Sequence, residues 1–222
     1  MGYDWDFSYV FSNMDVLFLG FVGTLKIGIL SLVLAAILGL VLALLRMSGR
    51  PWLKRLITIY IEFFRIMPIL ALLFWVYYAL PIATGLRIDG FTAAVLTLTV
   101  QSSAFFAEVY RAGIESIEKS QWEGGKSIGM TSAQLMRRII LPQAMRRMIP
   151  PFTERSFELM KGTTIAATIA YGDLLYSALV LSAQLYRPLE IISVVALFYL
   201  VMLTLASMFL RRLERRLDSA ML

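Results

Sequence analysis

The sequence predicts an all-α membrane protein with about five transmembrane helices, and three observations support this fold class. First, 59% of the 222 residues are hydrophobic and the mean hydropathy is +0.75, whereas a soluble domain is close to half apolar. Second, the apolar residues form long runs that are flanked by clusters of lysine and arginine. Third, there is no internal repeat, linker or second domain, so we expect one transmembrane domain spanning residues 1–222.

The composition leaves few enzymatic options. Cysteine and histidine are both absent, which removes Cys nucleophiles, His acid–base chemistry and Cys/His metal sites. No glycine-rich phosphate loop of the Walker A type is present either. The net charge is +6, and the positively charged residues cluster beside the apolar runs, as they do in cytoplasmic loops of membrane proteins. This distribution argues against a nucleic-acid partner. We therefore expect no catalytic residue, no metal site and no cofactor on this chain.

Residues 1–15 are aromatic and acidic and contain no lysine or arginine, which is typical of an interfacial segment. They lack the basic start of a signal peptide, so we expect them to be retained. The first span covers residues 16–45, long enough to cross a hydrocarbon core of ~30 Å. Four positive charges follow at once: Arg46, Arg50, Lys54 and Arg55. Such a cluster belongs in the cytoplasm, so the N-terminus is predicted outside.

Residues 56–80 form the second predicted span, in which Pro68 should kink the helix. A short external turn at 81–90 leads to the third span at 91–110. We expect the third helix to continue past Arg111 into the cytoplasm.

The remaining spans differ in their patterns. Residues 143–170 are interrupted by charges, prolines and glycine, so we expect a fourth, broken helix that faces protein or water. Residues 173–187 should return along the outside with a short helix. Residues 191–210 form a clean last span, and the arginines after it place the C-terminus in the cytoplasm.

The polar, basic loop at 120–142 stands out from its apolar surroundings. Ser120 with Glu123 fits a capping box at the start of a helix covering 121–128. That helix would be roughly 12 Å long and too short to be stable alone in water, so it needs a surface to dock on. A second capping box and a left-handed helix stop are predicted just downstream, at Thr131, Gln134 and Gly129.

The spacing within this loop carries a resemblance. The key residues are Glu123, Gly124, Gly125, Gly129, Ile139, Leu141 and Pro142. Their order resembles the EAA loop of ABC-importer permeases, E-A-A-x3-G-x9-I-x-L-P, with glycines in place of both alanines. The resemblance implies that the segment, with Ser120, forms a coupling helix in a groove of an ATPase subunit. The alternative is an ordinary amphipathic turn in which Glu123 only caps the helix.

Further segments extend the resemblance along nearly the whole chain. They are similar, in order and spacing, to motifs of the polar amino-acid permeases and lie at 60–68, 107–114, 161–165, 187–188 and 213–217. One departure is Gly162, where the family often has aspartate. The resemblance implies a permease subunit of a binding-protein-dependent ABC importer in the cell inner (plasma) membrane. It would carry a polar amino acid or a close derivative into the cytoplasm.

The resemblance also implies partners. These are a dimer of ABC ATPase subunits that hold ATP and Mg²⁺, an external solute-binding protein, and a second permease chain. The second permease chain would be either an identical copy or a paralogue.

Polar residues inside the spans are candidates for the substrate path: Glu62, Arg65, Gln101, Glu154, Arg155, Glu158, Lys161 and Thr163. Glu62 and Arg65 lie three residues apart and therefore share a helical face, as do Glu108 and Arg111. Two interpretations stay open for these pairs. They are ion pairs that let the charges remain in the membrane, or they also orient groups beside the path.

The same choice applies to the fourth helix. Glu154, Glu158 and Lys161 share one face, and Arg155 should project about 100° away. These charges either pair among themselves or across a dimer, or they line a cavity for a zwitterion.

A second function class stays open on the residues alone. A stand-alone channel or an ion-coupled secondary transporter would use the buried charges as a relay. A membrane-embedded enzyme is a weaker alternative, because histidine and cysteine are missing.

Overall fold

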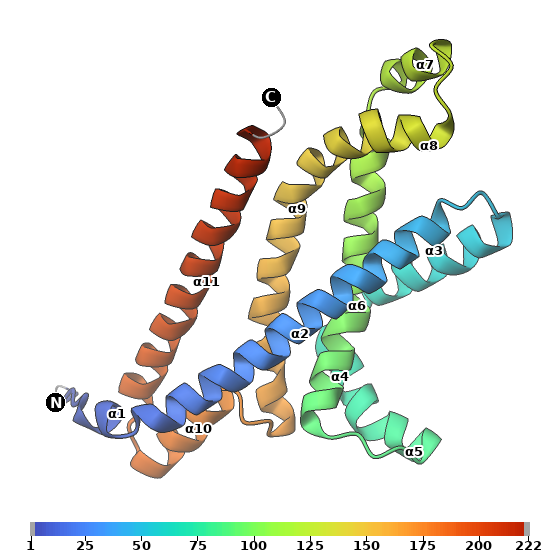
Figure 1. The fold of residues 1–222 in the computed structure, drawn as a ribbon. Coiled ribbons are helices and arrows are strands. Elements are labelled where there is room, and N and C mark those ends of the chain that lie inside the picture. The colour runs from blue at the N-terminus through green and yellow to red at the C-terminus, as the bar shows by residue number, and fades with distance from the viewer. Residues whose placement is uncertain (1–2, 220–222) are drawn as a thin grey trace. The chain divides into compact units, whose positions relative to one another are not determined.

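The computed structural model describes residues 3–219, and within them the regular structure is all helical (Figure 1). Three of these helices contain apolar stretches long enough to cross a membrane: α2 (Met14–Arg46), α6 (Gly90–Glu115) and α11 (Pro188–Ser219). Two further helix pairs qualify as bent spans, which gives up to five crossings. The all-α membrane fold with about five spans is thus confirmed, whereas the sidedness of the termini stays a prediction.

The three straight spans lie where the hydropathy pattern predicts them. The ranges 16–45, 91–110 and 191–210 fall inside α2, α6 and α11, and α6 continues past Arg111 to Glu115. The 33 residues of α2 correspond to roughly 50 Å of helix at 1.5 Å per residue. This length exceeds a hydrocarbon core of ~30 Å, so α2 must tilt or extend into the interface.

Pro68 breaks the second span more strongly than the predicted kink. α3 (Pro51–Ile66) ends just before it, and the helical run Ile69–Thr84 leaves at 106° to α3. Because the residue before a proline avoids the helical region, the break falls at this point. Pro81 is helical, so the external turn expected at 81–90 shrinks to 85–89. The run consists of α4 (Ile69–Phe74), the π-helical turn η1 (Trp75–Ala79) and α5 (Leu80–Thr84).

The predicted break within 143–170 is absent where the prolines lie. α9 (Leu141–Gly162) runs through both Pro150 and Pro151, and the 3-10 helix η3 (Thr163–Ile169) continues it. The bend comes later, where Ala170 takes a left-handed conformation (φ 56°) and α10 (Leu174–Leu185) starts at 46° to the preceding run. α10 confirms the short helix expected at 173–187. Its N-cap is Asp173, whose carboxylate accepts a hydrogen bond from the Tyr176 N–H.

The chain forms two compact units, each assembled from three separate stretches. Unit 1 contains residues 3–33, 67–99 and 159–205, and unit 2 contains residues 34–66, 100–158 and 206–219. Each has its own hydrophobic clusters.

In unit 1 the N-terminal segment attaches to the start of α11. Tyr3 donates a hydrogen bond to the fully buried Glu190, and the Asp6 N–H donates to the same carboxylate at 3.2 Å. Arg187 donates to the Asp4 carbonyl oxygen at 2.7 Å. The short helix α1 (Ser8–Ser12) adds Val10 to the buried cluster. The expectation that residues 1–15 form an interfacial segment is therefore incomplete, because this segment also makes specific polar contacts.

Unit 2 contains the cytoplasmic loop predicted at 120–142 and the charged ends of the helices that lead into it. One buried cluster joins Ile57 and Ile61 of α3 to Ala104 and Ala107 of α6. A second cluster lies beneath the loop and includes Leu135 and Ile140. Three short elements connect α6 to α9: α7 (Lys119–Ser127), α8 (Ser132–Leu135) and the π-helical turn η2 (Met136–Ile140).

Candidate functional site

The structure contains the candidate coupling helix, and the C-terminal end of this helix has the left-handed glycine stop that the sequence predicts. α7 covers Lys119–Ser127, close to the predicted range 121–128. Gly129 is left-handed (φ 79°) and donates its N–H to the Lys126 carbonyl, while the Met130 N–H donates to the Gly125 carbonyl at 3.1 Å. This pair of hydrogen bonds is a Schellman motif. Downstream, Thr131 and Gln134 form the predicted capping box of α8.

The predicted capping box at the start of α7 is wrong. The N-cap is Glu118, without a side-chain cap, and the Ser120 hydroxyl donates to the Glu118 carboxylate at 3.3 Å. α7 starts before Ser120, so Ser120 lies inside the first turn and lacks the non-helical backbone conformation that an N-cap residue uses to reach the free N–H groups. The Glu123 side chain is exposed and has no polar partner among the described side chains, those of residues 3–208 and 212. Capping therefore does not explain Glu123, and its carboxylate is free for an external contact.

The two glycines that follow Glu123 have different surroundings. A Cβ added at Gly124 would meet no atom within 4 Å, whereas one added at Gly125 would lie 2.3 Å from Leu135 Cδ1. Leu135 is only 1% exposed and is packed in the cluster beneath the loop. Gly125 thus permits the close approach of α7 to α8, while Gly124 faces open space.

The Ile-x-Leu-Pro end of the motif, residues 139–142, connects the loop to the buried cluster and to α9. Ile139 packs against the buried cluster, and its carbonyl accepts a hydrogen bond from Gln143 at 2.9 Å. Leu141 and Pro142 begin α9, and Leu141 is 37% exposed. At the base, Arg147 donates to the Ser116 carbonyl, which ties α9 to the end of α6. The loop is therefore held by α6 and α9 together.

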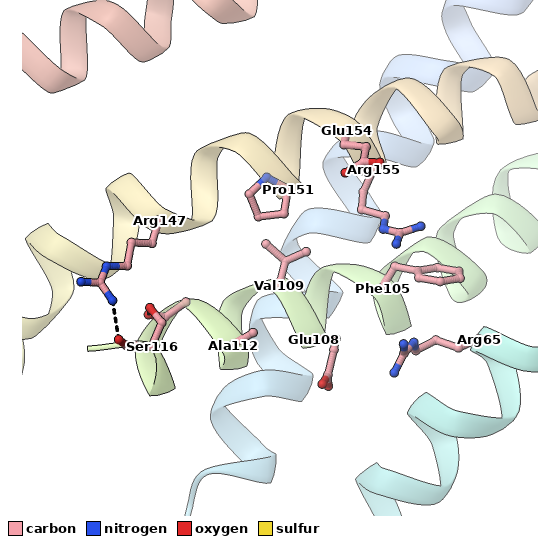
Figure 2. A pocket seen from close by; sticks show the side chains of 11 residues that line it. Arg65, Phe105, Glu108, Val109, Ala112, Ser116, Arg147, Pro151, Glu154 and Arg155 are labelled. Carbon is pink, nitrogen blue, oxygen red and sulfur yellow. Dashed lines mark hydrogen bonds between the residues drawn. The ribbon is translucent and has the colours of Figure 1, made fainter. Parts of the chain in front are cut away.

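A second candidate region is a charged pocket of about 300 Å³ between α3, α6 and α9 (Figure 2). The guanidinium groups of Arg65 and Arg155 both face the Phe105 ring, at 5.8 and 4.8 Å from its centroid. Glu154 also lines the pocket and has no ion-pair partner among the side chains that the structure describes, residues 3–208 and 212. The pocket is thus lined by three arginines, Arg65, Arg147 and Arg155, and by two glutamates, Glu108 and Glu154.

The predicted substrate-path residues divide into two groups. Arg65, Glu154 and Arg155 line the pocket, whereas Glu62, Gln101, Glu158, Lys161 and Thr163 do not. Thr163 is fully buried and its hydroxyl donates to the Met160 carbonyl at 2.8 Å. Lys161 is exposed, in unit 1.

The ion-pair interpretation holds for Glu62–Arg65, with 3.7 Å between the charged atoms, and for Glu108–Arg111. On α9, Arg155 pairs with Glu158 at 2.5 Å. Arg155 lies one residue after Glu154, about 100° around α9, but the i,i+3 spacing still brings the long side chains of Arg155 and Glu158 together.

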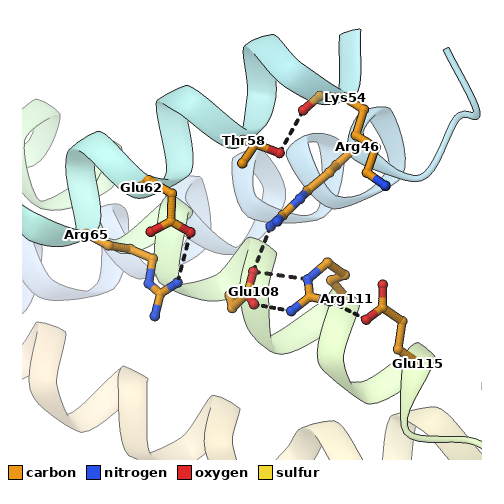
Figure 3. Close-up of polar contacts among 8 residues, drawn as sticks. All are labelled: Arg46, Lys54, Thr58, Glu62, Arg65, Glu108, Arg111 and Glu115. Atoms are coloured by element: carbon orange, nitrogen blue, oxygen red, sulfur yellow. Dashed lines mark hydrogen bonds and ion pairs between the residues drawn. The ribbon is translucent and has the colours of Figure 1, made fainter. Parts of the chain in front are cut away.

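The sequence did not reveal that Glu108 has a second arginine partner besides Arg111. Arg46, at the end of α2, donates to Glu108 at 2.8 Å, and Arg111 contacts both Glu108 and Glu115 (Figure 3). Arg46 is 62 positions away from Glu108, so helical spacing could not reveal it. The only sequence signal was an arginine directly after an apolar span. The resulting network joins α2 to α6.

Comparison with known proteins identifies the family. Residues 10–221 match the family described as binding-protein-dependent transport system inner membrane component. The probable glutamine ABC transporter permease protein GlnM of Bacillus subtilis is 39% identical, over 96% of this chain and 98% of its own. The glutamine transport system permease protein GlnP of Escherichia coli K12 is 36% identical, over 98% and 99%.

The fold gives the same result. A crystal structure of an amino acid ABC transporter superimposes with a TM-score of 0.90 at 33% identity, covering 96% of this chain and 100% of the other. These comparisons do not support the alternative of an ion-coupled carrier. The chain belongs to the inner-membrane components of binding-protein-dependent transport systems and is a permease subunit of an ABC importer.

Proposed function

We propose that this permease moves a polar amino acid or a close derivative into the cytoplasm. The observation that carries the substrate class is the charged pocket in a chain whose full-length relatives are described as glutamine permeases. The guanidinium groups of Arg65 and Arg155 suit a carboxylate, and the unpaired Glu154 suits an ammonium group. An amino acid carries both groups.

Partner subunits would supply ATP binding, substrate delivery and the other half of the transport pathway. A dimer of separate ATPase subunits would bind ATP and Mg²⁺, an external solute-binding protein would deliver the substrate, and a second permease chain would complete the pathway. α7 would dock on the ATPase through Glu123. Because the loop is held by the ends of α6 and α9, movement of the ATPase would act on both helices that line the pocket.

Substrate class is tested on the complete importer in liposomes. Arg155→Gln should lower uptake roughly tenfold or more, since a hydrogen bond to a charged group contributes about 1.5–3 kcal/mol. Arg146→Gln is the matched control, because Arg146 lies on the same helix and does not line the pocket. The ligand that co-purifies with the solute-binding protein should be an amino acid. A sugar or a metal chelate in its place would refute the proposed substrate class.

Coupling is tested by Glu123→Ala, with Glu118→Ala as the control. Both glutamates are exposed in the same loop, and Glu118 makes only a local contact with Ser120. Glu123→Ala should leave the permease folded, because this side chain is exposed and makes no polar contact with the described part of the chain. It should weaken ATPase attachment by about 1.5–3 kcal/mol and reduce substrate-stimulated ATP hydrolysis and uptake together. Normal coupling at normal subunit stoichiometry would exclude Glu123 from the mechanism.

A cysteine-labelling experiment checks the predicted sidedness of the same loop. An impermeant thiol reagent added outside should label Asp4→Cys and Arg87→Cys but not Lys126→Cys. External labelling at position 126 would contradict docking on a cytoplasmic ATPase.

A further inference from the structure

A basic pocket separate from the candidate site lies where α2 ends and α3 begins. It has a volume of about 580 Å³, and its lining residues include Arg46, Gly49, Pro51, Lys54, Arg111 and Glu115. This volume falls in the range of ligand pockets, about 300–1,000 Å³. Four of the lining side chains are drawn in Figure 3: Arg46, Lys54, Arg111 and Glu115. None of them lines the charged pocket on which the proposed function rests.

The charges around this pocket favour an anion. Three cations line it against one carboxylate, Glu115, which already accepts a hydrogen bond from Arg111. Glu108 lies beside the pocket and binds Arg46 and Arg111, which fixes the positions of both guanidinium groups. Within residues 3–208 and 212, whose side chains are described, the Lys54 ammonium group has no ion-pair partner. Arg46 uses one hydrogen bond to Glu108 and keeps further N–H donors for a ligand.

The position of the pocket relates it to the membrane surface. The apolar run of α2 ends at Leu45, directly before Arg46, so the pocket lies at the level where a span leaves the hydrocarbon. Trp52, the residue after Pro51, is 64% exposed, and tryptophan is enriched at this interface. The sequence predicts this side to be cytoplasmic, where the surface of the membrane carries anionic lipids.

An exposed apolar stripe on α3 leads away from the pocket. Its members recur every three or four residues and so share one helical face: Trp52, Leu56, Ile59, Phe63 and Ile66. The opposite face of α3 is the one that packs inside unit 2, through Ile57 and Ile61. A polar pocket at the head of an apolar stripe has the chemical order of a phospholipid, with a headgroup followed by acyl chains.

We propose that this pocket binds the phosphate headgroup of an anionic phospholipid whose acyl chains lie along the α3 stripe. Arg46, Lys54 and Arg111 contact the phosphate, and Glu108 holds the two arginines in place. A zwitterionic phospholipid binds more weakly, because its own ammonium group opposes the three cations. The site would tie the α2–α3 corner to the anionic leaflet.

Trp52 provides a reporter for the experiment. The complete importer in phosphatidylcholine nanodiscs is titrated with brominated phosphatidylglycerol or brominated phosphatidylcholine, and fluorescence quenching is recorded. Subtracting the signal of Trp52→Phe isolates quenching at this residue. Quenching of Trp52 should reach half-saturation at a lower fraction of phosphatidylglycerol than of phosphatidylcholine.

Charge-matched variants separate a built site from general attraction to the surface. Lys54→Gln should raise the phosphatidylglycerol midpoint about fivefold and leave the phosphatidylcholine midpoint unchanged. Arg55→Gln removes the same charge from the neighbouring position, which does not line the pocket, and should have a smaller effect. Equal shifts in the two variants would mean unspecific surface attraction and would overturn the proposal.

Two further arms distinguish other occupants. Inorganic phosphate or glycerol 3-phosphate should not displace the lipid at matched concentration, and displacement would assign the pocket to a soluble phosphate compound instead. An unchanged lipid curve in Lys54→Gln, combined with loss of ATPase subunits from the complex, would assign the pocket to a protein contact. Either result would refute the lipid site.

Discussion

Replacing the two glycines of α7 one at a time should give opposite results, although the residues are adjacent and chemically identical. Gly124→Ala adds a methyl group in open space, and Gly125→Ala adds one 2.3 Å from Leu135 Cδ1. Both changes improve intrinsic helix propensity by about 0.5–1 kcal/mol. Only the second disturbs the packing of α7 on α8.

The cost at Gly125 follows from the surroundings of Leu135. The contacted atom is the end of the Leu135 side chain, which is 1% exposed and packed in the buried cluster beneath the loop, so any shift that makes room must disturb that cluster. Forcing an extra methyl group into a packed core costs about 1–3 kcal/mol. This cost exceeds the helical gain, so Gly125→Ala should loosen α7 while Gly124→Ala stabilises it.

Hydrogen exchange of the α7 amides in the assembled importer measures the difference directly. Exchange should become slower in Gly124→Ala and faster in Gly125→Ala, separating the two variants by roughly 5- to 150-fold for 1–3 kcal/mol. Coupled uptake should follow the same order. Leu135→Val shortens the opposing side chain, so combining it with Gly125→Ala should cost less than the sum of the two single changes. Identical exchange in both alanine variants would show that close packing is not the role of Gly125.

Two further predictions concern charges that the structure places in defined contacts. Glu108→Gln removes the carboxylate that Arg46 and Arg111 share, so the thermal midpoint of the complex should fall by an amount equivalent to about 1.5–3 kcal/mol. The control is Glu62→Gln, in a more exposed ion pair, which should cost under about 1 kcal/mol. Equal losses of stability in the two variants would contradict a special role for the Arg46–Glu108–Arg111 network. Hydrogen bonds from the hydroxyl and N–H groups of Thr92 lower the pKa of Asp89 below its ordinary 3.8, so the charged cap stabilises α6 above that value and is lost as the pH falls below it. Asp89→Ala should therefore cost about 1 kcal/mol at neutral pH, with the difference from wild type shrinking below about pH 4, whereas a pH-independent difference in first-turn hydrogen exchange would refute this reasoning.

Several features of this protein could be predicted from local sequence alone, for a physical reason in each case. Lipid cannot satisfy free backbone groups, so long apolar runs must be helices, and α2, α6 and α11 lie where the hydropathy places them. Gly129 and the Thr131–Gln134 capping box also follow from chemistry within a few residues.

Helix breaks were less predictable. A proline favours the end of a helix or a kink, but tertiary packing decides whether the helix breaks there. Pro68 ends α3 and redirects the chain by 106°, whereas Pro150 and Pro151 are accommodated inside α9. Each proline removes the N–H that would bond the carbonyl four residues earlier, at Arg146 and Arg147, and neighbouring helices or ordered water can satisfy such carbonyls. The start of α7 shows the same limit, since Glu118 takes the N-cap position that the sequence pattern assigns to Ser120.

The sequence by itself determined the membrane fold, the approximate spans and the position of the coupling loop, because these depend on hydropathy, charge and spacing along the chain. Only the tertiary structure decided which side chains from different helices contact one another. Arg46 reaches Glu108 from another helix, Arg65 and Arg155 converge on one ring, and Gly125 faces Leu135 while Gly124 faces open space. Each of these pairings depends on how α2, α3, α6, α8 and α9 approach in space, and helical periodicity relates residues only within one helix.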